Sequence, residues 1–124
     1  MKVLSIDQSY TCSGIVVLND GHMEHCEVFK TKKPDNAKDM KQTYHRAFLV
    51  AEHIATLAKD YKPDFISIEG LAFGMRGSAT RDLAGLQFVI VVELIERLKY
   101  DVEVLSPLSV KKFATGSGKG KKLK

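Results

Sequence analysis

Two acidic residues, Asp7 and Glu69, each stand directly after a short apolar run of the sequence. Asp7 follows Val3 to Ile6, and Glu69 follows Phe65 to Ile68. Such runs are typical of buried strands, so each acid is expected at the carboxyl end of a strand. On neighbouring parallel strands, about 4.8 Å apart, the two carboxylates would either share a proton or bind a cation between them. Mg²⁺, which prefers oxygen ligands, is the expected cation.

A structural role is the alternative for Asp7, because an Asp after a strand often makes only a local turn. Glu69 does not fit that interpretation, since Glu is depleted in strands and caps turns poorly. Ligand sites of open α/β sheets also lie outside the carboxyl ends of the strands. The two acids together therefore favour a functional site.

The composition indicates one compact domain, since 44% of the 124 residues are hydrophobic. The longest apolar stretch, residues 83–95, is too short to span a membrane and includes Gln87 and Glu93. Met1 leads into the first strand without the features of a signal peptide, so a cytoplasmic location is expected. Cys12 and Cys26 are too few for a disulfide framework and are expected to be free thiols.

The apolar pattern predicts an α/β fold with a five-stranded mixed sheet: a three-strand antiparallel meander plus two parallel strands, with helices on both faces. The strands are expected at residues 3–7, 14–18, 22–30, from Pro63 to Glu69, and 102–105. Asn19-Asp20-Gly21 has the composition of a tight hairpin turn. Three helices are expected: from Met40 to the Lys62-Pro63 pair, from a cap at Ser78 or Thr80 to about Lys99, and at residues 106–113.

Both long helices carry apolar stripes at helical spacing. In the first, the stripe consists of Met40, Tyr44, Ala47, Phe48, Ala51, Ile54, Leu57 and Ala58. In the second, one face holds Leu83, Leu86, Ile90, Leu94 and Leu98, and much of the rest is covered by Phe88, Val89, Val92 and Ile95. A helix that is apolar on nearly all sides needs a second surface to cover it, and a second subunit is the expected one.

Four stretches in order resemble one family. "IDQSYTCSGIVVL", "FISIEG" with its Gly/aromatic loop, the long apolar helix, and "LSPLSVKKFATGSGKGKK" are similar to RuvC-like Holliday-junction resolvases of the ribonuclease H-like superfamily. The opening resembles phage-type members, which would place the protein in the cytoplasm of a bacterial host. The resemblance implies a Mg²⁺-dependent endonuclease of DNA recombination and repair that cleaves four-way junctions or other branched DNA by two-metal hydrolysis, with Mn²⁺ able to substitute.

The resemblance also implies roles for individual residues. Asp7 and Glu69 would be catalytic metal ligands, and Lys122 would be the essential lysine of a Gly-x-Gly loop. Family members carry further acids on a helix beyond this loop. We therefore expect residues 1–124 to be a single ribonuclease H-like nuclease domain that lacks this last helix, as part of a longer protein.

DNA contacts are expected from an aromatic residue and from basic residues. Phe73 would stack on bases at the crossover, and Arg76 would contact the backbone beside it. Residues 111–124 hold six lysines and no acid, which contributes to the net charge of +4 and suggests polyanion binding. Phosphate contacts are expected from Lys111, Lys119, Lys121 and Lys122. A junction with two-fold symmetry would be matched by a homodimer with two sites.

Three other functions fit parts of the pattern. "DQSYTCSG" is similar to the phosphate-binding turn of the actin and sugar-kinase superfamily. A nuclease of the same superfamily that processes structured RNA is the closer alternative. A non-catalytic junction-binding module is the third.

Overall fold

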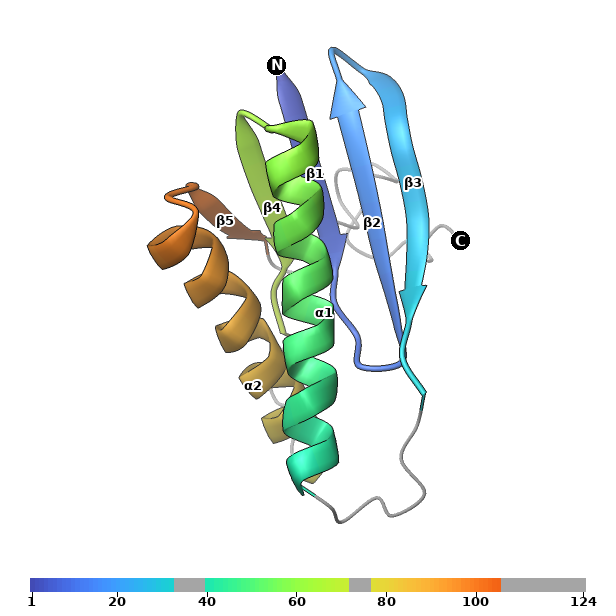
Figure 1. Ribbon diagram of the computed structural model, residues 1–124, viewed down its shortest axis with the longest axis vertical. Helices are drawn as coiled ribbons and strands as arrows, with labels where there is room; N and C mark the ends of the chain where they lie inside the picture. Colours follow the sequence, from blue (N-terminus) through green and yellow to red (C-terminus); the bar gives the residue numbers. More distant parts are fainter. Residues whose placement is uncertain (33–39, 72–76, 106–124) are drawn as a thin grey trace, which may run out of the picture.

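The structure is a computed structural model that describes residues 1–32, 40–71 and 77–105 (Figure 1). Five strands form one sheet in the order β3-β2-β1-β4-β5. They are β1 (Lys2–Asp7), β2 (Cys12–Asn19), β3 (His22–Lys30), β4 (Phe65–Glu69) and β5 (Val102–Leu105). β1, β2 and β3 pair in antiparallel fashion, whereas β1–β4 and β4–β5 are parallel. The predicted mixed sheet is confirmed, and β1 is its central strand.

The antiparallel half of the sheet is set by a two-residue turn. Asp20 and Gly21 join β2 to β3 with φ angles of 51° and 83°, the left-handed values that a type I′ hairpin requires. β3 therefore follows directly along β2 and forms the edge of the sheet, as its mixed polar and apolar sequence predicts.

Both long helices lie on the same face of the sheet (Figure 1), so in the part of the chain that the structure describes the helices cover one face and not the two faces predicted from the sequence. They are α1 (Met40–Tyr61) and α2 (Ser78–Val92), and a π-helical turn, η1 (Glu93–Arg97), continues α2. Their buried side chains form one core with the sheet, whose fully buried members include Leu4, Ile15, Val50, Ile54, Ile66, Leu86, Ile90 and Leu94. The helix expected at residues 106–113 lies outside the described residues. Within those described, no helix combines the length and apolar character needed to cross a membrane.

Part of the predicted apolar stripe of α1 is wrong, since Met40, Tyr44 and Phe48 do not join the core but are exposed. Phe48 lies next to the buried Ala47, so it is exposed because it projects from another side of the helix. For Met40 and Tyr44 the reason is length: α1 has 22 residues and so spans about 33 Å, whereas a strand of six residues spans about 20 Å. The first turns of α1 therefore extend past the ends of the strands (Figure 1).

The predicted cap of the second helix needs correction. Gly77 is the N-cap residue of α2 and no side chain caps it, so neither Ser78 nor Thr80 has that role. At the other end, η1 stops at Arg97, with Leu98 as its C-cap residue, and Lys99 has a left-handed φ of 60°. The helix thus ends close to Lys99, as the sequence predicts.

Candidate active site

Asp7 and Glu69 are the last residues of β1, the central strand of the sheet, and of its neighbour β4. These strands are parallel, and their register pairs Ser5 with Ser67 and Ile6 with Ile68. The next step along both strands brings Asp7 and Glu69 to the same level. The structure therefore places the two acids at neighbouring strand ends, as the sequence predicts.

The two acids also point to the same face of the sheet. The Oγ atoms of Ser5 and Ser67 lie 3.0 Å apart, so these side chains project side by side from the two strands. Side chains alternate between faces along a strand, and Asp7 and Glu69 lie two residues further on. Because Leu4 and Ile6 are buried on the helix side, the acids project from the face opposite α1 and α2.

Two glutamines fix the backbone at the end of β4. The Glu69 carbonyl oxygen accepts hydrogen bonds from Gln8 Nε2 at 2.8 Å and from Gln87 Nε2 at 2.9 Å. On the other side, the Gly70 N–H donates to the Leu105 carbonyl at 2.5 Å. Gln8 is only 7% exposed. Gln8 after β1, Gln87 of α2 and Leu105 of β5 thus hold the strand end that carries the Glu69 carboxylate.

Neither glutamine was predicted to have a role in the site. Gln8 follows the predicted first strand, and Gln87 interrupts the apolar stretch of residues 83–95. The available signal was that interruption, because a polar side chain on a helix that packs against a sheet needs a buried hydrogen-bond partner.

The turn after Asp7 is held by its own serines and by α2. The buried Ser13 hydroxyl donates to the Ser9 carbonyl at 2.6 Å and accepts from the Ser9 N–H at 3.0 Å. The Tyr10 hydroxyl donates to the Asp82 carbonyl of α2 at 2.5 Å. Burial, with the nearby Asp82 carboxylate, raises the pKa of Tyr10, so the hydroxyl remains a donor at neutral pH. The chain that follows Asp7 is therefore well ordered.

Gly14 leaves space beside Asp7 on the β2 side. It pairs with Asp7 in the antiparallel register, and a Cβ atom at position 14 would lie 3.7 Å from the Asp7 Cβ. Any larger side chain there would extend along the face from which Asp7 projects. The residue directly next to this acid is thus a glycine, which has no side-chain carbon to crowd it.

The donor set of Asp7 and Glu69 fits a hard divalent cation. Mg²⁺ usually binds proteins through one or two carboxylates and keeps several waters, so two carboxylates at neighbouring strand ends suffice. In the ranges that the structure describes, no group of three or more His, Cys, Asp or Glu residues is arranged to hold a metal ion. The site is therefore a two-carboxylate site as far as these ranges extend.

The remaining predicted site residues lie outside the described ranges. They are Phe73, Arg76, Lys111, Lys119, Lys121 and Lys122. Their proposed contacts with DNA, and the catalytic role of Lys122, stay predictions.

A mixed sheet of order β3-β2-β1-β4-β5 with both helices on one face defines the ribonuclease H-like class of folds. The chain is similar to Thermus thermophilus RuvC, with a TM-score of 0.74 and 20% identity over 98% of this chain and 74% of that one. The structure of T. thermophilus RuvC in complex with a Holliday-junction substrate gives a TM-score of 0.74 and 18% identity over 90% and 70% of the two chains. The yeast mitochondrial Holliday junction resolvase Ydc2 gives a TM-score of 0.63 and 20% identity over 92% of this chain and 54% of that one.

Residues 3–124 match the family described as crossover junction endodeoxyribonuclease RuvC, and the chain belongs to this family. A sequence comparison with curated proteins gives no significant match. Family membership confirms the nuclease assignment and decides against the sugar-kinase alternative.

Proposed function

We propose that the protein is a Mg²⁺-dependent endonuclease that hydrolyses phosphodiester bonds in four-way DNA junctions. The observation that carries this proposal is the pair of carboxylates at the ends of β1 and β4, at one level and on one face of the sheet. Membership of the crossover junction endodeoxyribonuclease family supports the substrate class. Mn²⁺ is expected to replace Mg²⁺, since both ions accept carboxylate and water ligands.

Each residue of the site has a separate task in this proposal. Asp7 and Glu69 hold the metal ions, which supply an activated water and stabilise the leaving oxygen when they are bound. Gln8 and Gln87 hold the Glu69 backbone, so that its carboxylate needs little reorganisation before it binds. Gly14 leaves room for a phosphate group beside Asp7. Lys122 is proposed to offset negative charge in the transition state.

We propose in addition that the protein acts as a homodimer. Phe88, Val89, Val92 and Ile95 of α2 and η1 are exposed, and Phe48 of the adjacent α1 is exposed as well. Apolar side chains that gather on neighbouring helices mark an interaction surface. A C₂ dimer would place two sites on a junction that must be cut in two strands.

The proposed substrate is tested with wild-type protein on labelled nucleic acids of equal length. We expect Mg²⁺-dependent nicking of a four-way DNA junction, with little cleavage of the matching linear duplex and of a structured RNA. Preferential cleavage of the RNA would instead support the RNA-processing alternative. Tight binding to the junction without cleavage in Mg²⁺ or Mn²⁺ would support the non-catalytic module. The phage-type origin stays a prediction.

A further inference from the structure

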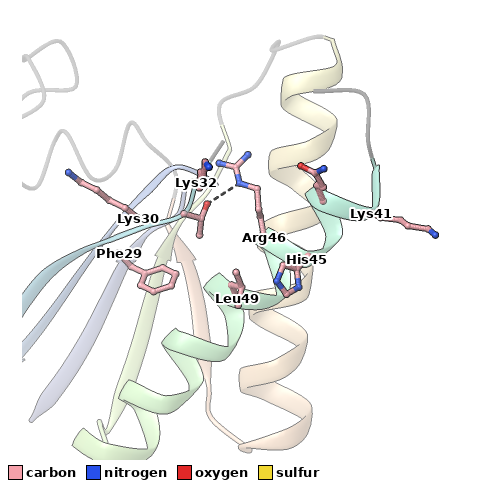
Figure 2. Close-up of a pocket in the computed structure, with 9 residues that line it drawn as sticks. Phe29, Lys30, Lys32, Lys41, His45, Arg46 and Leu49 are labelled. Atoms are coloured by element: carbon pink, nitrogen blue, oxygen red, sulfur yellow. Dashed lines mark hydrogen bonds between the residues drawn. The ribbon is translucent and has the colours of Figure 1, made fainter. Parts of the chain in front are cut away.

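A surface pocket of about 580 Å³ lies between the end of β3 and the first turns of α1 (Figure 2). It forms where α1 extends past the sheet, so that the helix and the strand end leave a hollow between them. Phe29 and Leu49 line it from the two elements. The other lining residues are Lys30, Thr31, Lys32, Lys41, Gln42, His45 and Arg46.

The pocket is at the same end of the sheet as the candidate active site. Within β2, Gly14 pairs with Asp7 on one side, and Cys12, two residues earlier, pairs with Lys30 on the other. The end of β3 therefore lies across one intervening strand from the end of β1. The pocket is on the helix side of the sheet, whereas the acids project from the opposite face. A DNA strand that contacts both must therefore pass around this end of the sheet, where Arg46 lies against Thr11 and Tyr10 of the turn after Asp7.

Among the lining residues that the structure describes, every charged side chain is positive. Lys30, Lys32, Lys41 and Arg46 are cationic, His45 is titratable, and none of these described residues is Asp or Glu. The three lysines are exposed. Residues 33–39, which join the two walls in sequence, contain two lysines and two aspartates and so add no net charge. Lys30 and Lys41 extend from the pocket to opposite sides (Figure 2), which spreads the positive charge over a surface wider than the pocket itself.

Arg46 is fixed between this pocket and the turn after Asp7. Its Nε donates to Thr31 Oγ1 at 2.9 Å, and its Nη2 donates to Thr11 Oγ1 at 3.1 Å. The guanidinium also lies over the Tyr10 ring, 5.6 Å from its centroid. A cation held in one orientation beside the site binds a phosphate with little loss of conformational entropy.

We infer that this pocket and its lysine rim form a binding site for the sugar-phosphate backbone of the substrate DNA. The inference rests on the proposed function, because it assigns the pocket to the DNA strand that leads to the cleaved bond. A DNA backbone, with its row of phosphate groups, matches the observations better than a single small anion does. The positive side chains come from two elements and point in different directions, so they can contact several phosphates. Such contacts position the DNA and carry no sequence preference.

The test replaces one lysine on each wall, in Lys32→Gln/Lys41→Gln. Arg46 is left intact because its hydrogen bonds hold the turn after Asp7. The matched control is Lys62→Gln/Lys99→Gln, which removes the same charge from exposed positions before β4 and β5, at the opposite end of those parallel strands. Binding to a fluorescein-labelled four-way junction is measured by anisotropy in EDTA over a series of salt concentrations.

The pocket variant is expected to bind about tenfold more weakly than wild type at about 0.1 M salt. A plot of the logarithm of the binding constant against the logarithm of the salt concentration should also be less steep by about two, because each lost phosphate contact contributes about 0.9 to that slope. The control variant is expected to bind the junction with nearly the affinity of wild type and with the same salt-dependence slope. Equal affinities and slopes for the two variants, or no DNA binding by wild type, would overturn the inference. Cleavage is scored separately: a wild type that binds through these lysines but does not cleave refutes only the proposed catalysis.

Discussion

Asp7 is the residue on which the proposed chemistry depends, and its surroundings are as informative as the acid itself. It ends the central strand, projects from the face opposite the helices, and has Gly14 as its cross-strand neighbour. The serine pair one level below it, Ser5 and Ser67, shows that the two strands align their side chains closely at this point. The site is thus built from strand register and not from a flexible loop.

The first prediction concerns the space beside Asp7. Gly14→Val is expected to lower the Mg²⁺-dependent cleavage rate roughly 10-fold to 100-fold, the range seen when a residue that supports metal ligands is changed. The added side chain would occupy the face beside the carboxylate, whereas a β-branched residue suits a strand and keeps the fold. Gly14→Ala is the control, because its Cβ would make an ordinary 3.7 Å contact. Wild-type cleavage by the Val variant, with unchanged thermal stability, would contradict this role of Gly14.

At the scale of elements, β3 is joined to α1 by a cluster around Glu27. Its Oε1 lies 2.5 Å from His53 Nε2 of α1 and 3.3 Å from His25 Nε2 on its own strand. The Phe29 ring stacks on His53 with 4.1 Å between centroids. Partial burial acts to raise the pKa of Glu27, but the hydrogen bond from His53 and the nearby His25 ring outweigh it and lower the pKa below 4.5.

This lowered pKa gives a prediction about stability and pH. A carboxylate whose pKa is lower in the folded state stabilises the fold above its unfolded pKa, and this contribution is lost as the pH falls through the folded value. Glu27→Gln is therefore expected to lower the free energy of unfolding by about 1 kcal/mol at pH 7. The difference from wild type should shrink as the pH falls below 4.5. Urea unfolding of both proteins at pH 7 and in acid measures it, and an equal difference at both pH values would contradict the assignment.

The elements were predicted best where local chemistry decides them. The bounds of β3 and β5 agree with the sequence prediction, because a Gly-containing turn precedes one and the end of a helix precedes the other. The exposed Met40 and Tyr44 were misassigned because helical periodicity does not record where the sheet ends. The hydrogen bonds of Gln8 and Gln87 with Glu69 join residues more than fifteen positions apart, and only the folded topology brings them together.

At the scale of the whole molecule, the apolar surface of α2 leads to a prediction about assembly. Phe88 is 73% exposed although it lies in the middle of an apolar helix. Wild-type protein is expected to sediment as a dimer, and Phe88→Ser is expected to sediment as a monomer because it removes the largest exposed apolar side chain of that surface. Met23→Ser is the control: Met23 is 63% exposed on β3, away from α2. A wild type that remains monomeric at high concentration would contradict the dimer.

The overall topology and the place of the site followed from the sequence to a large extent. Apolar runs that end in Asp7 and Glu69 predicted two strands with acids at their carboxyl ends, and the pattern of the whole chain predicted a three-strand meander plus two parallel strands. The sequence did not show that the acids share a face, which depends on the register of β1 and β4. It also did not predict the pocket at Arg46, since that cluster unites the end of β3 with the start of α1 across nine intervening residues.

The most direct test of the account is strand cleavage by an Asp7→Asn variant on a labelled four-way junction in Mg²⁺. We expect cleavage to fall to background while junction binding in EDTA stays close to that of wild type, because the substitution removes a metal ligand and leaves the basic surfaces unchanged. Asp101→Asn, an exposed acid just before β5 at the opposite end of the parallel strands, should cleave normally. Nicking by Asp7→Asn at the wild-type rate would contradict the proposal that the acids at the ends of β1 and β4 form the catalytic site.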